Sequence, residues 1–250
     1  MMKEGRKMLS KINSMALLGL DGYLIEVQVD VSNGMPCWEM VGLPDTSVKE
    51  AKERVKTAIK NSGYEMLSKR IVINLAPADT KKEGSIFDLP IAIGILKDLG
   101  EIKNDKLDEI AFVGELSLDG KINRVNGILP MCIEAQQLGI KKLIVPKENA
   151  KEAAIVKEME VLGAKDLKQV VKYLNNELQI HKSEVDLEKI FSKDNQYLLD
   201  FSEVKGQENI KRALEISAAG GHNCLLIGSP GSRENYDGKK NSIYIARFKF

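Results

Sequence analysis

The sequence predicts an α/β (α+β) fold in which a strand-rich start is followed by alternating strands and helices. Three observations carry this prediction. Residues Tyr23–Val31 (YLIEVQVDV) alternate apolar and polar side chains, which is the period of a half-buried strand. In the segment after Asp45, apolar residues recur at helical spacing. From Arg70 to Asn176, short β-branched runs alternate with longer helical segments, as in a mixed α/β domain.

The first elements are a predicted hairpin and a helix. Asn33-Gly34, a strong turn signal, follows the strand Tyr23–Val31, so Cys37–Val41 (CWEMV) is expected to be its hairpin partner. Asp45 or Thr46 is placed to cap the helix that follows. The apolar stripe of this helix consists of Val48, Ala51, Val55, Ala58 and Ile59. Its polar face carries Lys49, Lys52, Arg54, Lys56 and Lys60, which we interpret as a solvated face balanced by Glu50 and Glu53 rather than a nucleic-acid surface.

The remaining elements of the first domain are predicted from the same two patterns, the alternation of a strand and the apolar spacing of a helix. Predicted strands are Arg70–Leu75, Ile110–Leu118, Lys142–Val145 and Glu160–Leu162. Predicted helices run from about Asp88 to Leu99, Ile128 to Leu138 and Leu167 to Leu174. The helix from Asp88 is apolar almost all round and is therefore expected to be buried.

The sequence predicts four parts in order along the chain. Residues 1–176 form the first domain, and the polar segment 177–199 is a linker without clear periodicity. Residues 200–232 start a second α/β domain, with a helix over about Gln207–Ala219 and a buried strand ending at Ile227. From residue 233 to 250 the pattern is lost, and this segment is interpreted as an aberrant tail.

Composition excludes several classes of function. The net charge of +1 does not indicate a polyanion partner for the chain as a whole. The 3 cysteines and 2 histidines are far apart in the sequence, so no metal site is expected. Unpaired cysteines favour a reducing compartment, and no apolar stretch approaches the ~20 residues of a membrane span. The predicted location is cytoplasmic.

Four long segments carry a family resemblance. They are VGLPDTSVKEAKERVKTAIKNSGY, RIVINLAPADTKKEGSIFDLPIAIGIL, FVGELSLDGKINRVNGILP and DFSEVKGQENIKRALEISAAGGHN. Over residues 12 to about 232 the chain resembles the magnesium-chelatase-like AAA+ ATPases of the ComM/YifB family. The resemblance implies a ribosomal S5 domain 2-like, Lon proteolytic-domain-like fold, followed here by an incomplete P-loop AAA+ fragment. It also implies hexameric, DNA-processing motors that use ATP and magnesium.

The residues of a Lon-type Ser/Lys dyad are missing. Aligned on the Lys-acidic-Gly segment, the serine position of such proteases falls on Ile86, and Ser85 is one residue away. Aligned on Gly127, the lysine position falls on Leu129. Because a serine nucleophile needs a base to accept its proton, we expect no catalytic residues. A residual role of Ser85 with Lys81 or Lys82 is the less favoured interpretation; Ser85 is expected to cap the helix instead.

The nucleotide-binding motif is also incomplete. Gly228, Ser229, Pro230, Gly231 and Ser232 match the first half of a P-loop. The template then requires Gly, Lys and Ser or Thr, but the chain has Arg233, Glu234 and Asn235. A glutamate at the lysine position places a carboxylate against phosphate, so neither ATP nor magnesium is expected to bind this chain. The abrupt change after Ser232 suggests a frameshift or truncated gene.

Two functions remain open at this point. The chain is either a remnant of a DNA-processing ATPase or a stand-alone, non-catalytic binding module built on the Lon-like domain. The module would bind DNA or full-length family subunits. Candidate contacts in its loops are Lys81, Lys82, Lys121 and Arg124, although isolated loop lysines are more often solvated charges.

Overall fold

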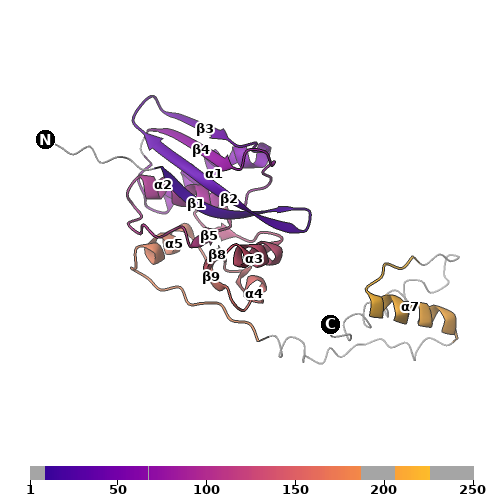
Figure 1. The fold of residues 1–250 in the computed structure, drawn as a ribbon. Helices are drawn as coiled ribbons and strands as arrows, with labels where there is room; N and C mark the ends of the chain where they lie inside the picture. Colours follow the sequence, from indigo (N-terminus) through magenta and orange to yellow (C-terminus); the bar gives the residue numbers. More distant parts are fainter. Residues whose placement is uncertain (1–8, 67, 187–205, 226–250) are drawn as a thin grey trace. The chain divides into compact units, whose positions relative to one another are not determined.

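The computed structural model describes residues 9–66, 68–186 and 206–225 (Figure 1), and the statements below apply to these residues. The chain divides into two units, Met1–Leu187 and Glu188–Phe250, which are described separately. In the described part of the chain, none of the helices is both long and apolar enough to cross a membrane.

A mixed sheet forms the centre of the first unit. Within the described residues it has seven strands in the order β3-β4-β2-β1-β5-β8-β9. Their bounds are β1 (Ser10–Leu18), β2 (Asp21–Ser32), β3 (Cys37–Val41), β4 (Arg70–Ala76), β5 (Ile110–Phe112), β8 (Lys142–Pro146) and β9 (Glu160–Ala164). Strand β2 is antiparallel to both β1 and β4, and the other neighbouring pairs are parallel. The predicted α/β class is confirmed, with a mostly parallel sheet.

The start of the sheet differs from the prediction. The hairpin partner of β2 is β1, which the sequence patterns missed, and the turn between them contains Gly19 at φ +66°. The predicted hairpin between β2 and β3 is wrong. Strand β4 lies between them, and β3 pairs with β4 in parallel, with Cys37 opposite Arg70. Because a turn dipeptide specifies only a local reversal, Asn33-Gly34 could not reveal that a later strand would be inserted.

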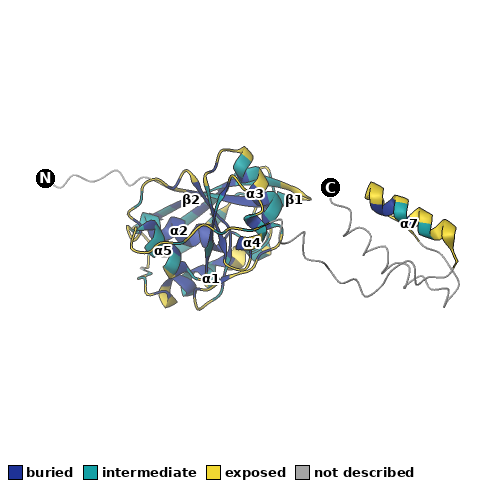
Figure 2. Ribbon diagram, turned by 90° about the horizontal axis from the view of Figure 1, so that it is seen from below, coloured by how far each residue is buried: buried dark blue, intermediate teal, exposed yellow. Residues whose placement is uncertain are grey.

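Helices cover the sheet and bury two hydrophobic cores (Figure 2). The helices of the first unit are α1 (Thr46–Asn61), α2 (Asp88–Asp98), α3 (Ile128–Gln137), α4 (Ala150–Ala153) and α5 (Leu167–Leu174). Buried side chains of α1, α2 and α5 share one core, and those of α3 and α4 share the other. Successive residues of β8 face opposite ways, since Leu143 belongs to the second core and Ile144 to the first. As predicted, α2 is buried along almost its entire length.

The predicted strand 110–118 is interrupted in the structure. It divides into β5 and a short strand β6 (Glu115–Leu116), which pairs with β7 (Ile122–Asn123) in a separate two-stranded sheet. Between them, the amide of Gly114 donates to the Ile86 carbonyl, and the amide of Leu89 donates to the Gly114 carbonyl. These bonds attach the break in the strand to the segment that leads into α2.

The segment after α5 returns to the sheet. Lys182 forms an isolated antiparallel bridge with Leu162 of β9, and the amide of Ser183 donates to the Val161 carbonyl at 2.8 Å. The boundary between the two units falls after Leu187. Part of the range 177–199 that the sequence assigns to a linker therefore contacts the edge of the first domain.

In the second unit, the described residues form the helix α7 (Glu208–Gly220), close to the predicted Gln207–Ala219. Gly221, in the left-handed conformation at φ 61°, ends the helix, and the Ser217 hydroxyl donates to the His222 carbonyl. Cys224 and Leu225 are exposed and form no regular element. The rest of the predicted strand ending at Ile227 lies outside the described residues, as does the tail 233–250.

The three cysteines are expected to differ in reactivity. Cys132 on α3 is fully buried, its thiol lies 3.5 Å from the Ala153 carbonyl oxygen, and burial raises its pKa to about 12. Because the thiolate is the reactive form, an aromatic disulfide reagent should modify exposed Cys224 first, then half-buried Cys37. We expect Cys132 to react only after unfolding in urea. Mass spectrometry of the labelled peptides would identify each thiol, and modification of Cys132 in native protein would contradict the prediction.

Candidate functional site

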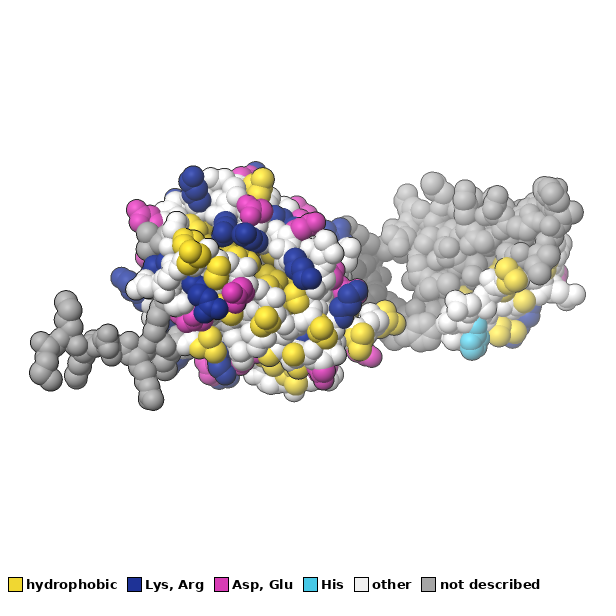
Figure 3. Space-filling model, turned by 90° about the horizontal axis from the view of Figure 1, so that it is seen from above, with side chains coloured by type: hydrophobic (Ala, Val, Ile, Leu, Met, Phe, Trp, Pro, Cys, Tyr) yellow, Lys and Arg dark blue, Asp and Glu magenta, His cyan; other side chains and the backbone are white. Residues whose placement is uncertain are grey.

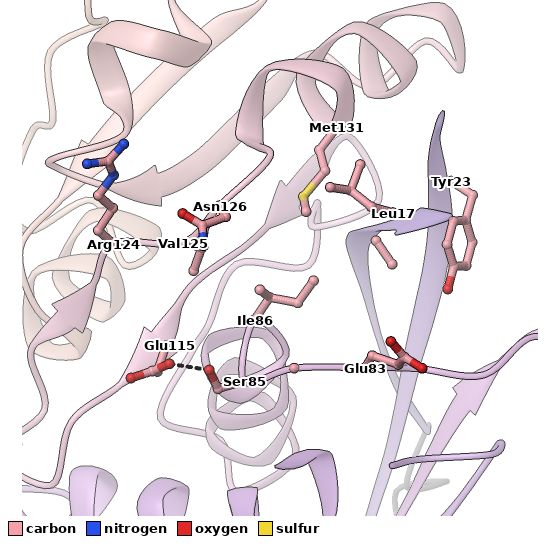
Figure 4. A pocket seen from close by; sticks show the side chains of 12 residues that line it. Leu17, Tyr23, Glu83, Ser85, Ile86, Glu115, Arg124, Val125, Asn126 and Met131 are labelled. Carbon is pink, nitrogen blue, oxygen red and sulfur yellow. Dashed lines mark hydrogen bonds between the residues drawn. The ribbon is translucent and has the colours of Figure 1, made fainter. Parts of the chain in front are cut away.

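The candidate site is a cavity of about 370 Å³ in the first unit. It lies where the β1–β2 hairpin, the segment before α2 and the segment between β7 and α3 meet (Figure 4). Its lining residues are Ala16, Leu17, Tyr23, Glu83, Gly84, Ser85, Ile86, Glu115, Arg124, Val125, Asn126 and Met131. This set includes Ile86, the position on which the resemblance to Lon-type proteases places the serine.

A tight turn presents Ser85 to the cavity. Gly84 forms this turn with a φ of +84°, and its amide lies 3.4 Å from the Asp45 carboxylate that also caps α1. Helix α2 begins at Asp88, three residues after Ser85, with Phe87 in the N-cap position and no side-chain cap. The prediction that Ser85 caps this helix is therefore wrong.

The hydroxyl of Ser85 instead donates a hydrogen bond to Glu115, as the dashed line in Figure 4 shows. The second oxygen of the Glu115 carboxylate accepts from Asn123 Nδ2 at 3.1 Å. Glu115 thus links the turn before α2 to the β6–β7 hairpin. Sequence reasoning did not single out this glutamate as a partner of Ser85, because 30 residues separate them.

The cavity does not contain the lysine that would activate the serine of a Lon-type dyad. Ile86 lines it, and Leu129, at the predicted lysine position, does not. Arg124 is the single cationic side chain of the lining, and neither lysine nor histidine is part of it. An arginine stays protonated and cannot accept the proton of a hydroxyl, so the arrangement does not provide the base of a Ser/Lys dyad.

The two lysines before the site have other partners. Lys82 is fully buried, and its ammonium group donates to the backbone carbonyls of Pro77 and Thr80. Burial also lowers the pKa of Lys82. Exposed Lys81 forms an ion pair with Glu83 at 2.7 Å. Neither ammonium group is hydrogen-bonded to Ser85. Because Lys82 is buried, its ammonium group is not on the surface, where a contact with DNA or a partner was predicted.

The other two predicted contacts lie on different cavities. Arg124 lines the candidate site, whereas Lys121 lines a second cavity together with Lys147 and Lys165. Lys121 is also paired with Asp119 at 2.7 Å. The structure therefore does not bring the four predicted basic contacts together in one place.

A buried ion pair joins α1 to the first residue of α2, three residues after Ser85. The Asp88 side chain is 1% exposed, and its carboxylate accepts from Arg54 Nε at 2.7 Å, from Arg54 Nη2 at 3.1 Å and from the Leu116 amide at 3.2 Å. Burial raises the pKa of Asp88, and the bonds from Arg54 oppose that shift. The solvated role predicted for Arg54 is wrong, because its guanidinium reaches the first turn of α2.

The nucleotide-binding candidates Gly228, Ser229, Pro230, Gly231 and Ser232 lie outside the described residues, so no geometry can be given for them. Among the described residues, no group of three or more histidine, cysteine, aspartate or glutamate side chains is placed to hold a metal ion.

Comparison with known proteins connects both units to one family. Residues 27–149 match the family model of subunit ChlI of Mg-chelatase, and residues 200–239 match a second model, magnesium chelatase subunit ChlI. The competence protein ComM of Haemophilus influenzae is 40% identical over 225 residues, covering 90% of this chain and 44% of ComM. YifB of Escherichia coli is 45% identical over 224 residues, covering 90% of this chain and 43% of YifB. The chain belongs to the ComM/YifB family.

This assignment confirms the family identified from the sequence. The chain spans less than half the length of these two relatives. Lon protease 2 of Bacillus subtilis is 28% identical over 180 residues, which cover 64% of this chain and 32% of that protease. Together with the mostly parallel mixed sheet, this similarity confirms the Lon-like fold of the ComM/YifB chain described here.

Proposed function

We propose that the first unit is a non-proteolytic, Lon-like binding domain of a DNA-processing protein of the ComM/YifB family. The observation that carries the proposal is the composition of the candidate site. Ile86 stands at the serine position, the neighbouring Ser85 hydroxyl is bound to Glu115, and the lining contains no lysine or histidine. A fold kept without its catalytic dyad can still contribute a binding surface.

We propose further that this chain does not bind ATP through residues 228–235. Support comes from the sequence, in which Arg233, Glu234 and Asn235 occupy the positions of the P-loop glycine, lysine and hydroxyl residue. The glutamate would repel a phosphate group that the lysine should attract. ATP hydrolysis with magnesium is accordingly proposed for the longer relatives and not for this chain.

DNA is the partner that we propose for the domain, with subunits of longer family members as the second candidate. The name of ComM as a competence protein supports DNA. Figure 3 shows one face of the first unit on which Lys and Arg side chains are interspersed with Asp and Glu, so binding there would rest on local groups and not on a broad positive field. The 3 free cysteines support a reducing, cytoplasmic location.

Three measurements on the whole chain test this function. Casein hydrolysis should stay at background and should not change in Ser85→Ala, whereas hydrolysis that this variant abolishes would refute the non-proteolytic role. Fluorescence anisotropy of labelled single-stranded DNA should show binding that weakens with salt. A titration with a fluorescent ATP analogue and magnesium should show no saturation, and micromolar affinity would contradict the broken P-loop.

A further inference from the structure

A second cavity, of about 420 Å³, lies beside the carboxyl ends of β8 and β9. Lys147 follows the last residue of β8 and Lys165 follows the last residue of β9. The β7 strand contributes Ile122 and Asn123, and Lys121 precedes it. Three lysines from three separate segments therefore line one cavity, together with Glu148.

Backbone hydrogen bonds hold these three segments together. The Lys147 amide donates to the Ala164 carbonyl at 2.8 Å, which joins the ends of β8 and β9. The Ile122 amide donates to the Lys165 carbonyl at 2.9 Å, and Lys121 forms a β-bridge with Asp166. The Cα positions of the lysines are thus fixed by the fold, although each side chain is exposed. A site on such a frame loses less entropy on binding than one on free loops.

The charges of the cavity are not balanced internally. Within the described residues, Lys147 and Lys165 form no ion pair, while Lys121 is paired with Asp119. Glu148 is the one acidic side chain of the lining. The nearby Asp166 carboxylate accepts from the Gln169 amide at 2.8 Å as the cap of α5, so its charge is partly used within the helix. The net charge of the lining is positive, which favours an anion.

We propose that the cavity lined by Lys121, Lys147 and Lys165 binds a phosphate group. Lysine ammonium groups recognise phosphate as point charges and tolerate varied orientations. The lining lacks an aromatic side chain on which a base could stack. The ligand is therefore recognised by its phosphate, either in a DNA backbone without regard to sequence or in a small phosphate compound. The inference that this phosphate belongs to DNA rests on the function proposed above. The inference that the cavity binds phosphate does not depend on that function.

The test compares four proteins, each the whole chain: wild type, Lys147→Glu/Lys165→Glu, Glu148→Gln, and the control Lys49→Glu/Lys106→Glu. The control makes the same change of net charge at two exposed lysines that lie elsewhere in the first unit. Circular dichroism and urea unfolding would verify that all four fold. The probes are pyrophosphate, followed by calorimetry, and a labelled single-stranded 20-mer, followed by anisotropy at several salt concentrations.

We expect the pocket variant, Lys147→Glu/Lys165→Glu, to bind both probes at least about tenfold more weakly than wild type. The dependence of its DNA affinity on salt concentration should have a slope smaller by about 1 for each lysine replaced. Glu148→Gln should strengthen binding, and the control should lower DNA affinity less than the pocket variant. Pyrophosphate binding that requires the pocket, without DNA binding, would support the site and refute the DNA function. DNA binding equal in the pocket and control variants would overturn the site and leave the function standing. Binding of neither probe would refute both.

Discussion

Replacing Arg54 by Met is expected to lower the free energy of unfolding by about 3–5 kcal/mol at pH 7. The substitution leaves the Asp88 carboxylate, 1% exposed, without the two hydrogen bonds and the positive charge that Arg54 supplies. A single bond would remain, from the Leu116 amide. Urea unfolding followed by circular dichroism measures the loss.

The pH dependence of this variant has a defined sign. Burial already raises the pKa of Asp88, and loss of Arg54 should raise it further. The native variant then holds a proton that the unfolded chain releases above about pH 4, so its stability rises as the pH falls through the native pKa. The deficit relative to wild type should be smaller at pH 5 than at pH 8.

Two control variants identify the cause. In Arg54→Met/Asp88→Asn no buried charge remains, so part of the lost stability should return. Arg70→Met breaks an ion pair in which the partner, Glu39, is 52% exposed, and should cost about 0–1 kcal/mol. If Arg54→Met and Arg70→Met lowered the free energy of unfolding equally, the buried pair would contribute no more to stability than the exposed one.

Gly42→Ala is expected to destabilise the first unit by about 2–5 kcal/mol, through backbone strain and steric overlap together. Gly42 follows β3 at φ +97°, and a Cβ atom there would lie 2.2 Å from the carbonyl oxygen of Leu75. This oxygen belongs to the backbone of β4 and can move only with the strand. Separation of β3 from β4 should accompany the loss, and hydrogen exchange of the β3 and β4 amides would detect it.

Gly100→Ala separates the two contributions. Gly100 has a similar φ of +85°, but a Cβ atom there would meet nothing within 4 Å. This substitution should lower the free energy of unfolding by about 1–2 kcal/mol, which is the penalty for placing alanine in a left-handed backbone conformation. If the two alanine variants unfold at the same urea concentration, the contact with Leu75 is not the reason for the glycine.

Patterns in the sequence predicted those elements that are fixed by local periodicity. Helices α1, α2 and α7 begin and end close to their expected residues, because caps, glycines and apolar stripes are local signals. Pairing between strands is not local. Strand β1 has six buried or half-buried residues in a row, from Ile12 to Leu17, without the alternation that marked β2, and it was missed. The insertion of β4 beside β2 depends on burial across the whole sheet.

The residues of the candidate site were predictable only in part. Alignment on a few glycines placed the dyad positions on Ile86 and Leu129; Ile86 lines the cavity and Leu129 does not. The partners of the charged residues were not predictable. Lys82 and Arg54 sit in polar patterns that resemble solvated surface, but tertiary packing directs one to backbone carbonyls and the other to Asp88. Charge in a sequence does not reveal which ammonium or guanidinium group will be enclosed.

The return of the chain to β9 has a mechanical consequence. A pull on the chain beyond residue 186 would be transmitted to β9 through contacts that include the bridge between Lys182 and Leu162 and the bond from Ser183 to Val161. Because these bonds lie at the edge of the sheet, we expect them to open under tension before the pairing of β8 with β9 does. The segment would then act as a short extensible tether at the edge of the Lon-like domain.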